Sequence, residues 1–156
     1  MPSTFFLYPG TIFVTSEPEI ISTILGSCVS VCFFDAALKI GGINHFMLPL
    51  WNGAGLASPK YGNIAIEKLL EKMISFGSKK HNLQAKIFGG SEILSNGNSL
   101  FSVGKRNIEV AHQLIEDYGI MVKSSHVGGK TGRKIRFNTA TGEVIMSFIQ
   151  PGNIFQ

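Results

Sequence analysis

Cys28 and His45 are the residues whose types and spacing best suit chemistry; they are seventeen positions apart in the sequence. A free thiol has a pKa of about 8.5 and is only about 3% ionised at pH 7, so a catalytic cysteine needs a nearby imidazole or oriented N–H groups. Gly26, two residues before the thiol, allows a tight turn in which backbone N–H groups face a developing oxyanion. The pair therefore predicts a cysteine hydrolase site with an ion-paired thiolate and imidazolium.

Each of these residues also fits a purely structural role. Cys28 could be a small buried hydrophobe, and His45 could be a core residue with its hydrogen bonds satisfied. His126 is the next candidate imidazole. His81, beside two lysines, and His112, on a predicted helix, are expected at the surface.

Metal, redox and nucleotide sites are weaker interpretations of the same residues. Cys28, Cys32, His45 and His126 lack the close pairs that are typical of zinc sites, and the cysteine spacing also fails for a thioredoxin-type motif. On one strand the two cysteine Cα atoms would be about 13 Å apart, too far for a disulfide. Residues 128–131 resemble the end of a phosphate-binding loop but lack its first glycine, which predicts a turn with basic side chains on the surface. We therefore expect no cofactor and no metal.

The elements that must position these residues are short strands and two helices. Residues 66–74 and about 105–118 have helical periodicity, with Gly77 and Gly119 as stops, and residues 52–63 and 95–99 predict loops. Segments rich in β-branched and aromatic residues predict strands over 11–14, 20–25, 29–34, 40–47, 84–88, 120–127, 134–138 and 143–149. This order predicts an α+β fold in a single domain over residues 1–156, with mainly antiparallel or mixed sheet layers and two helices packed on one face, like an α/β/β sandwich.

Composition fits a folded domain that meets an acidic partner. The chain has 156 residues, 44% of them hydrophobic, with 12 Phe, which is enough for a sizeable core. The net charge is +4, without a stripe of Lys and Arg that would indicate nucleic acid. No apolar run of about 18 residues and no signal-peptide pattern occurs, so we expect a cytoplasmic protein that does not insert into membranes.

Three blocks of sequence together resemble the bacterial chemoreceptor glutamine deamidase family, CheD. They are Leu25-Gly-Ser-Cys-Val-Ser-Val-Cys32, Gly42-Ile-Asn-His-Phe-Met-Leu-Pro49 and Ala85-Lys-Ile-Phe-Gly-Gly90, and the similarity continues through residues 104–107 and 128–137 to 141–144. The resemblance implies a cytoplasmic hydrolase that converts glutamines of methyl-accepting chemoreceptors, on their cytoplasmic helical bundle, to glutamates. It also implies a regulatory partner, the phosphatase CheC, and leaves open methyl-ester hydrolysis at the same site.

The resemblance further implies roles for individual residues. Cys28 is the expected nucleophile and His45 the general acid/base, with a threonine a few residues before the cysteine completing the site. Counting back without a gap gives Ser22, whereas the residue type matches Thr23; the two lie on opposite faces of a strand, and the ungapped count favours Ser22. His126 departs from the family pattern, which often has an acidic residue there. A non-catalytic binding module that regulates a phosphatase or a receptor is the alternative function.

Overall fold

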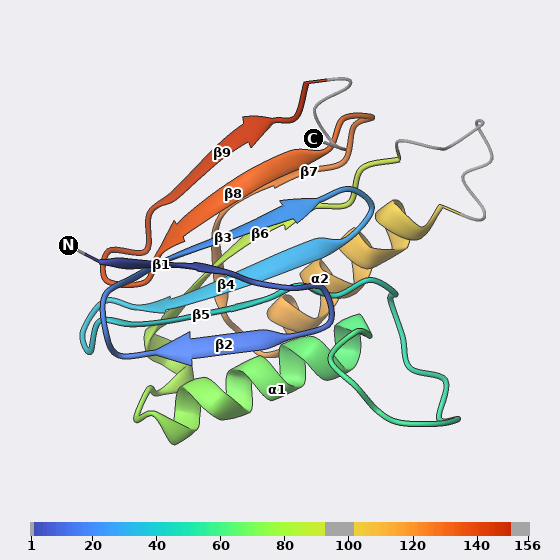
Figure 1. The fold of residues 1–156 in the computed structure, drawn as a ribbon. Coiled ribbons are helices and arrows are strands. Elements are labelled where there is room, and N and C mark those ends of the chain that lie inside the picture. Colours follow the sequence, from blue (N-terminus) through green and yellow to red (C-terminus); the bar gives the residue numbers. More distant parts are fainter. Residues whose placement is uncertain (1, 93–101, 151–156) are drawn as a thin grey trace.

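The computed structural model describes residues 2–92 and 102–150, in which two stacked sheets carry the fold (Figure 1). The five-stranded sheet has the order β2 (Ile12–Thr15), β5 (Ile40–Asn44), β4 (Val29–Asp35), β6 (Leu83–Gly89) and β7 (Met121–Val127). The four-stranded sheet has the order β1 (Ser3–Phe6), β3 (Glu19–Leu25), β8 (Arg133–Asn138) and β9 (Val144–Phe148). Most neighbours are antiparallel, and β1–β3 and β6–β7 are parallel.

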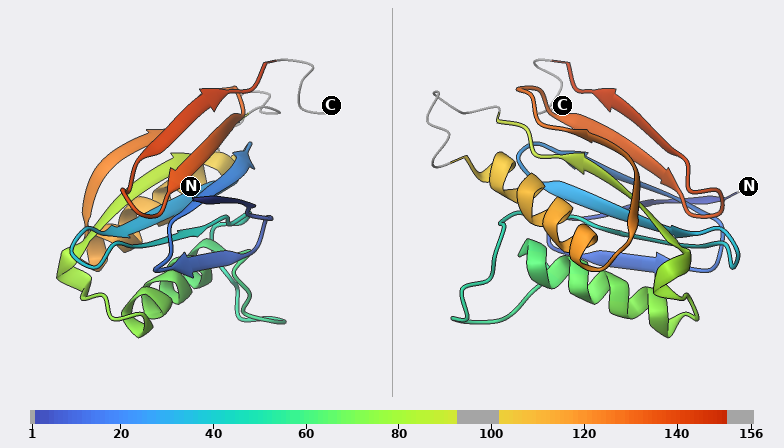
Figure 2. Two further views of the ribbon diagram at one scale, coloured as in Figure 1. Left: turned by 60° about the vertical axis from the view of Figure 1, so that its left-hand side comes forward. Right: turned by 180° about the vertical axis from the view of Figure 1, so that it is seen from behind.

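Two helices, α1 (Gly62–Ser75) and α2 (Val103–Asp117), cover the face of the five-stranded sheet that points away from the other sheet. Figure 2 shows this layering from two further directions. The structure thus confirms the predicted α+β fold, with helices, one sheet and a second sheet as successive layers.

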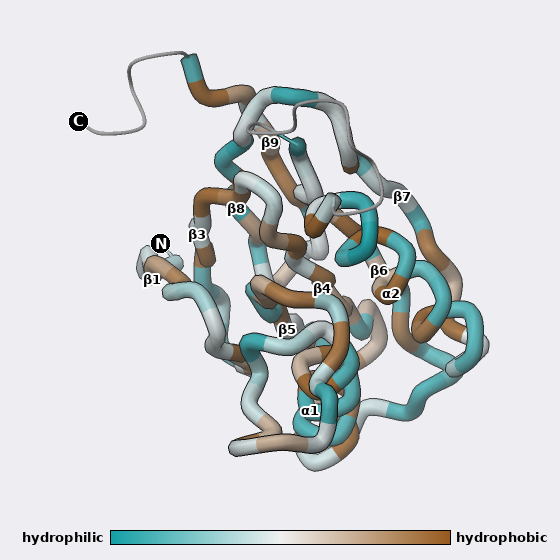
Figure 3. The backbone as a smooth tube through the Cα atoms, turned by 90° about the vertical axis from the view of Figure 1, so that its right-hand side faces the viewer, coloured by the Kyte–Doolittle hydropathy of each residue, from teal (hydrophilic) through white to brown (hydrophobic). Residues whose placement is uncertain are grey.

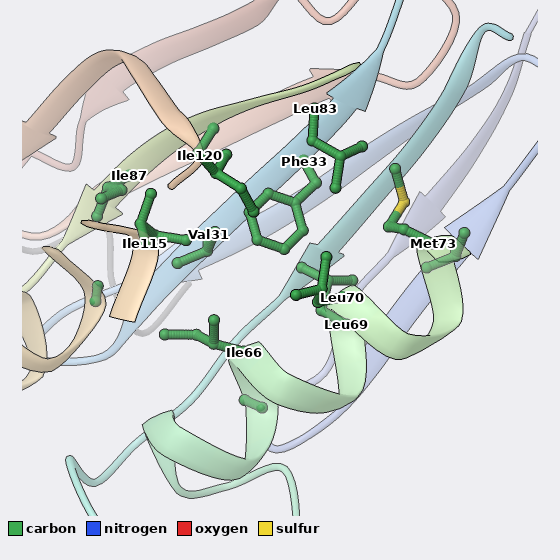
Figure 4. Packing of buried hydrophobic residues seen from close by; sticks show 14 of the residues in the cluster. Val31, Phe33, Ile66, Leu69, Leu70, Met73, Leu83, Ile87, Ile115 and Ile120 are labelled. Atoms are coloured by element: carbon green, nitrogen blue, oxygen red, sulfur yellow. The ribbon is translucent and has the colours of Figure 1, made fainter. Parts of the chain in front are cut away.

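The first core lies between the helices and the five-stranded sheet. Ile66, Leu69 and Met73 of α1 follow the spacing of one helical face and are fully buried against strand residues such as Val31 and Phe33 (Figure 4). In Figure 3 the tube of each helix alternates between hydrophobic and hydrophilic colours, as expected of helices with one buried face. This packing fixes the helices on the sheet.

The second core lies between the two sheets, and Cys28 packs against it. Its members include Cys32 and Ile43 from one sheet and Ile135 and Phe137 from the other. Along β3 the inward positions are Ile21, Thr23 and Leu25, each 0% exposed, and the alternate positions face outward.

The strand and helix predictions are confirmed with shifts at the ends. β5 stops at Asn44 rather than at residue 47, and α1 begins at Gly62, inside the predicted loop. Gly77 lies one residue beyond the C-cap Phe76, with φ of 109°. β1 and a short 3₁₀ turn, Lys80–Asn82, were not predicted. The predicted loop 95–99 lies outside the described residues.

None of the helices in the described parts of the chain is both long and apolar enough to cross a membrane. Both cysteines are free thiols; Cys32 is buried and Cys28 is partly exposed.

Candidate active site

Cys28 lies in the turn that carries the chain from β3 of one sheet to β4 of the other. Two backbone N–H groups just after β6 donate hydrogen bonds to carbonyl oxygens of this turn. The N–H of Gly90 donates to Cys28 O at 2.8 Å, and the N–H of Ser91 donates to Gly26 O at 2.9 Å. The backbone on either side of the thiol is therefore fixed in place.

The end of β6 touches Cys28 so closely that it requires a glycine. Gly89 has φ of 107°, and a Cβ added there would lie 2.2 Å from Cys28 O. A side chain at this position would both strain the backbone and push the cysteine turn away.

His45 follows β5 directly and is only 2% exposed. Its Nδ1 lies 2.7 Å from Thr23 Oγ1, and the same hydroxyl donates to Leu7 O at 2.8 Å. Because a hydroxyl has a single proton, Thr23 must accept from Nδ1–H when it donates to Leu7. This assigns the proton of neutral His45 to Nδ1 and leaves Nε2 with a free lone pair, which is the form of a general base.

Of the two hydroxyls considered from the sequence, the structure brings Thr23 and not Ser22 to the histidine. Thr23 is on the inward face of β3, whereas Ser22 is on the opposite face, 9% exposed, and makes no hydrogen bond to His45 among the described residues. The geometry therefore favours Thr23, which the residue type indicated, over Ser22, which the ungapped count favoured.

Strand register places Cys28 and His45 on the same face. Val29 and Phe46 exchange two backbone hydrogen bonds, of 3.1 and 2.9 Å, and further along the same antiparallel pair Cys32 faces Ile43. In this register Cys28 is the diagonal neighbour of His45, and diagonal Cα atoms lie about 7–8 Å apart, within reach of an imidazole. Both side chains also point between the sheets: Cys28 packs against the second core, and His45 meets Thr23 of the facing sheet.

Burial sets the charge of both groups. It raises the pKa of the Cys28 thiol, an effect that the residue's own backbone N–H partly offsets. It also lowers the pKa of His45 to about 4. Both directions favour the uncharged forms, so the free site holds a thiol and a neutral imidazole. This differs from the ion pair expected from the sequence.

Two backbone N–H groups beside the thiol are available to an oxyanion. Within the described residues the N–H groups of Ser27 and Cys28 have no backbone or side-chain oxygen as acceptor. The Cys28 N–H also lowers the pKa of its own thiol, so it stabilises negative charge at this position. Donors at such a position can stabilise the negative oxygen that forms when Sγ attacks a carbonyl carbon.

Arg133, two residues after the glycine turn at 128–131, is a buried cation next to the cysteine turn. Its side chain donates to Ser91 Oγ at 3.2 Å and to the carbonyl oxygens of His126 and Gly128, and the residue is 1% exposed. Lys130, by contrast, is exposed as expected. The N–H of Ser91 donates to Gly26 O, so the hydrogen bond from Arg133 to Ser91 indirectly holds the cysteine turn in place.

The remaining histidines lie away from the Cys28–His45 pair. The Nδ1 of His126, on β7, is 2.9 Å from an Arg133 nitrogen, and its ring stacks edge-on against Phe148. His81 is exposed, as predicted, and His112 is half-buried on α2. In the parts of the chain that the structure describes, no group of three or more His, Cys, Asp or Glu side chains is placed to hold a metal ion.

A rim of exposed apolar side chains follows His45 in the chain. Met47 and Leu48 are 39% and 38% exposed, and Leu50 and Leu56 are 56% and 88% exposed. The loop between them is braced internally, for example by Trp51 Nε1, which donates to Ala54 O at 3.0 Å. Such a rim suits an apolar partner surface next to the thiol.

Comparison with known proteins points to one family. A family model described as "CheD chemotactic sensory transduction" matches residues 47–148. A protein of Trichlorobacter lovleyi is 50% identical over 142 residues, covering 91% of this chain and 88% of its own. A protein of Sulfurimonas denitrificans is 42% identical over 146 residues, covering 93% and 94%. Both carry the name "probable chemoreceptor glutamine deamidase CheD".

The fold itself is also found in a distant solved structure. The crystal structure of the Bacillus licheniformis hypothetical protein YfiH superposes with a TM-score of 0.52 at 18% identity, covering 76% of this chain and 51% of that one. At this identity the likeness concerns the fold alone.

Proposed function

The chain belongs to the CheD family of chemotactic sensory transduction proteins, and from this premise we propose that it is a chemoreceptor glutamine deamidase that uses Cys28 as nucleophile. The observation that carries the proposal is the Nδ1–Thr23 hydrogen bond, which leaves Nε2 of His45 as a base on the same face as Cys28.

The first half of the reaction forms a thioester. Nε2 of His45 takes the thiol proton as Sγ attacks the carboxamide carbon of a glutamine side chain, and the N–H groups of Ser27 and Cys28 hold the oxyanion. The proton on Nε2 then passes to the departing nitrogen, which leaves as ammonia. Thr23 accepts from Nδ1–H throughout and keeps the ring oriented.

The second half restores the enzyme. Nε2 removes a proton from a water molecule that attacks the thioester carbon, a second oxyanion forms at the same donors, and Sγ leaves and recovers its proton from His45. The net change is glutamine plus water to glutamate plus ammonia. In each half of the reaction, Nε2 of His45 first takes a proton as a base and then gives it up as an acid.

We place the substrate on the cytoplasmic helical bundle of a methyl-accepting chemoreceptor, and the protein in the cytoplasm. The names of the relatives support a chemoreceptor substrate. The exposed rim of Met47, Leu48, Leu50 and Leu56 supports a partly apolar contact, as an amphipathic receptor helix would offer. Regulation by the phosphatase CheC is supported by the family resemblance alone.

The test is the mass of a receptor cytoplasmic fragment after incubation with the protein. Each deamidation adds about one mass unit; we expect wild type and Cys32→Ala to add it at defined glutamines and Cys28→Ala to add none. Cys32 is the matched control because it is the other cysteine of the chain and is buried in the second core. A fragment that binds the wild-type protein but never gains mass would favour the non-catalytic binding module instead.

A further inference from the structure

One side-chain nitrogen of Asn107, on α2, contacts both the segment that carries Cys28 and the segment that follows His45. Its Nδ2 donates to Ser27 O at 3.0 Å and to Met47 O at 3.1 Å, and the residue is 0% exposed. Since both partners are carbonyl oxygens, the atom that faces them must be the nitrogen, which fixes the orientation of the amide. The other amide atom, Oδ1, is buried without a partner among the described residues.

The two carbonyl oxygens belong to the segment before β4 and the segment after β5, which separate at this point. Val29 and Phe46 form the last bridge between them and exchange two backbone hydrogen bonds. Beyond them, the N–H groups of Met47 and Leu48 both turn to Lys60 O, at 2.8 and 3.1 Å. The Asn107 amide occupies the opening and joins one carbonyl oxygen from each branch.

Cys28 and His45 flank this opening. Cys28 lies between the paired Val29 and the tethered Ser27, and His45 directly precedes the paired Phe46. Cys28 lies on the segment that separates before Val29, whereas His45 lies on the paired side of the Val29–Phe46 bridge. A movement of the Ser27 segment would therefore change the distance between the thiol and the imidazole. Asn107 is the side chain that fixes this opening.

A glycine contact brings α2 close enough for Asn107 to reach. Gly104 lies one turn earlier on the same helix, and a Cβ added there would be 2.5 Å from Ser91 O and 2.6 Å from Gly90 O. The helix therefore rests directly on the backbone segment that holds the cysteine turn. A bulkier residue at position 104 would lift the helix and withdraw the Asn107 amide.

We propose that Asn107 is a positioning residue that sets the distance between Cys28 and His45. The proposal rests on the proposed function, because it assumes that these two residues react together. Burying an amide oxygen without a partner costs stability, so an amide here is not explained by packing alone. Its two donated hydrogen bonds provide the reason, since no apolar side chain of similar size could join the two carbonyl oxygens.

The experiment compares Asn107→Asp with Gln113→Glu, an amide-to-acid change on the exposed face of the same helix. At pH 8 the carboxylate of Asn107→Asp faces two carbonyl oxygens and cannot donate. We expect its kcat on the receptor fragment to fall about 10- to 100-fold, with KM changed less than about twofold, and Gln113→Glu to match wild type. As the pH falls toward about 5.5, protonation restores one donor, so the ratio of variant to wild-type kcat should rise.

Other outcomes overturn the proposal. Unchanged kcat at pH 8 would do so, and so would a rise in KM alone, which would assign Asn107 to the substrate surface. If Asn107→Asp does not fold, Asn107→Ala, which removes both donated hydrogen bonds, should lower kcat with KM changed less than about twofold, and wild-type kcat in that variant would count against positioning. Cys28→Ala is assayed in parallel: activity in Cys28→Ala would refute the proposed mechanism itself, a result separate from any outcome at Asn107.

Discussion

A single hydroxyl decides which nitrogen of His45 is free to act as a base. Thr23 gives its proton to Leu7 O and must receive one from Nδ1, so Nε2 has the lone pair. Burial keeps both His45 and Cys28 uncharged before substrate binds. In the proposed reaction, His45 would therefore take the thiol proton as Sγ attacks the amide.

This neutral pair predicts a particular pH dependence of alkylation. Iodoacetamide reacts with the thiolate, and burial raises the pKa of Cys28, so the rate should keep rising with pH through about 9. Deamidation needs neutral His45, whose pKa is about 4, so activity should be lost only as the pH falls toward that value. The measurement is the alkylation rate of Cys28 in a Cys32→Ala background between about pH 5 and 10. A plateau already reached below pH 7 would instead show a pre-formed ion pair.

At the scale of the element, the alternation of a strand explains which hydroxyl contacts His45. Neighbouring residues of β3 face opposite sides, so Thr23 lies between the sheets and Ser22 does not. A shift of one residue in the register of β3 would exchange them and leave His45 without its partner. The backbone pairing of β3 with β8 is what fixes that register.

Substitutions that remove the hydroxyl of Thr23 or of Ser22 form a matched pair of variants. Thr23→Val keeps the shape of the side chain but leaves Leu7 O and His45 Nδ1–H without a partner, which should cost about 1–3 kcal/mol of stability. We expect kcat to fall about 10- to 100-fold as the ring loses its orientation. Ser22→Ala should stay within about twofold of wild type. Thermal unfolding and deamidation rates measure both effects, and equal loss in the two variants would contradict the assignment.

Helix periodicity could have revealed Asn107, and strand alternation could have placed Arg133 on the inward face of β8 with Ile135 and Phe137. Asn107, Ala111 and Ile115 follow a spacing of four along α2, and all three are buried, so a polar residue at the first position was a detectable exception. The alternation does not show how a buried cation at this position finds its partners. Its burial follows from the approach of β7 and Ser91, which are far from it in sequence or in another sheet.

At the scale of the whole molecule, residue types predicted the strands and the layering, but not which strands pair. β3 lies between β1 and β8, which are separated from each other by more than one hundred residues. β1 itself was missed because all four of its residues are exposed, so it has no alternation of buried and exposed positions to detect. The contact of Thr23 with His45 depends on the stacking of two sheets, which no short segment encodes.

The overall charge predicts how association with the receptor responds to salt. The chain has a net charge of +4, and among the described residues a single ion pair, Lys68 with Glu71, joins opposite charges within 4.0 Å. If the receptor surface is acidic, raising NaCl from about 0.05 to about 0.5 M should lower kcat/KM about threefold through KM, with kcat unchanged. Steady-state assays on the receptor fragment at several salt concentrations test this. A kcat/KM that rises or stays constant would show that charge does not guide the encounter.

The position of β8 in the four-stranded sheet also has a consequence for biosynthesis. β3, which carries Thr23, is hydrogen-bonded along nearly its whole length to β8, at residues 133–138, while its other neighbour β1 has only four residues. A ribosome that has released the cysteine and the histidine must therefore still translate almost ninety further residues before the strand behind the histidine has its main partner. The newly made chain would stay unable to modify receptors until β8 has left the ribosome, and fragments that end before β8 would be inactive.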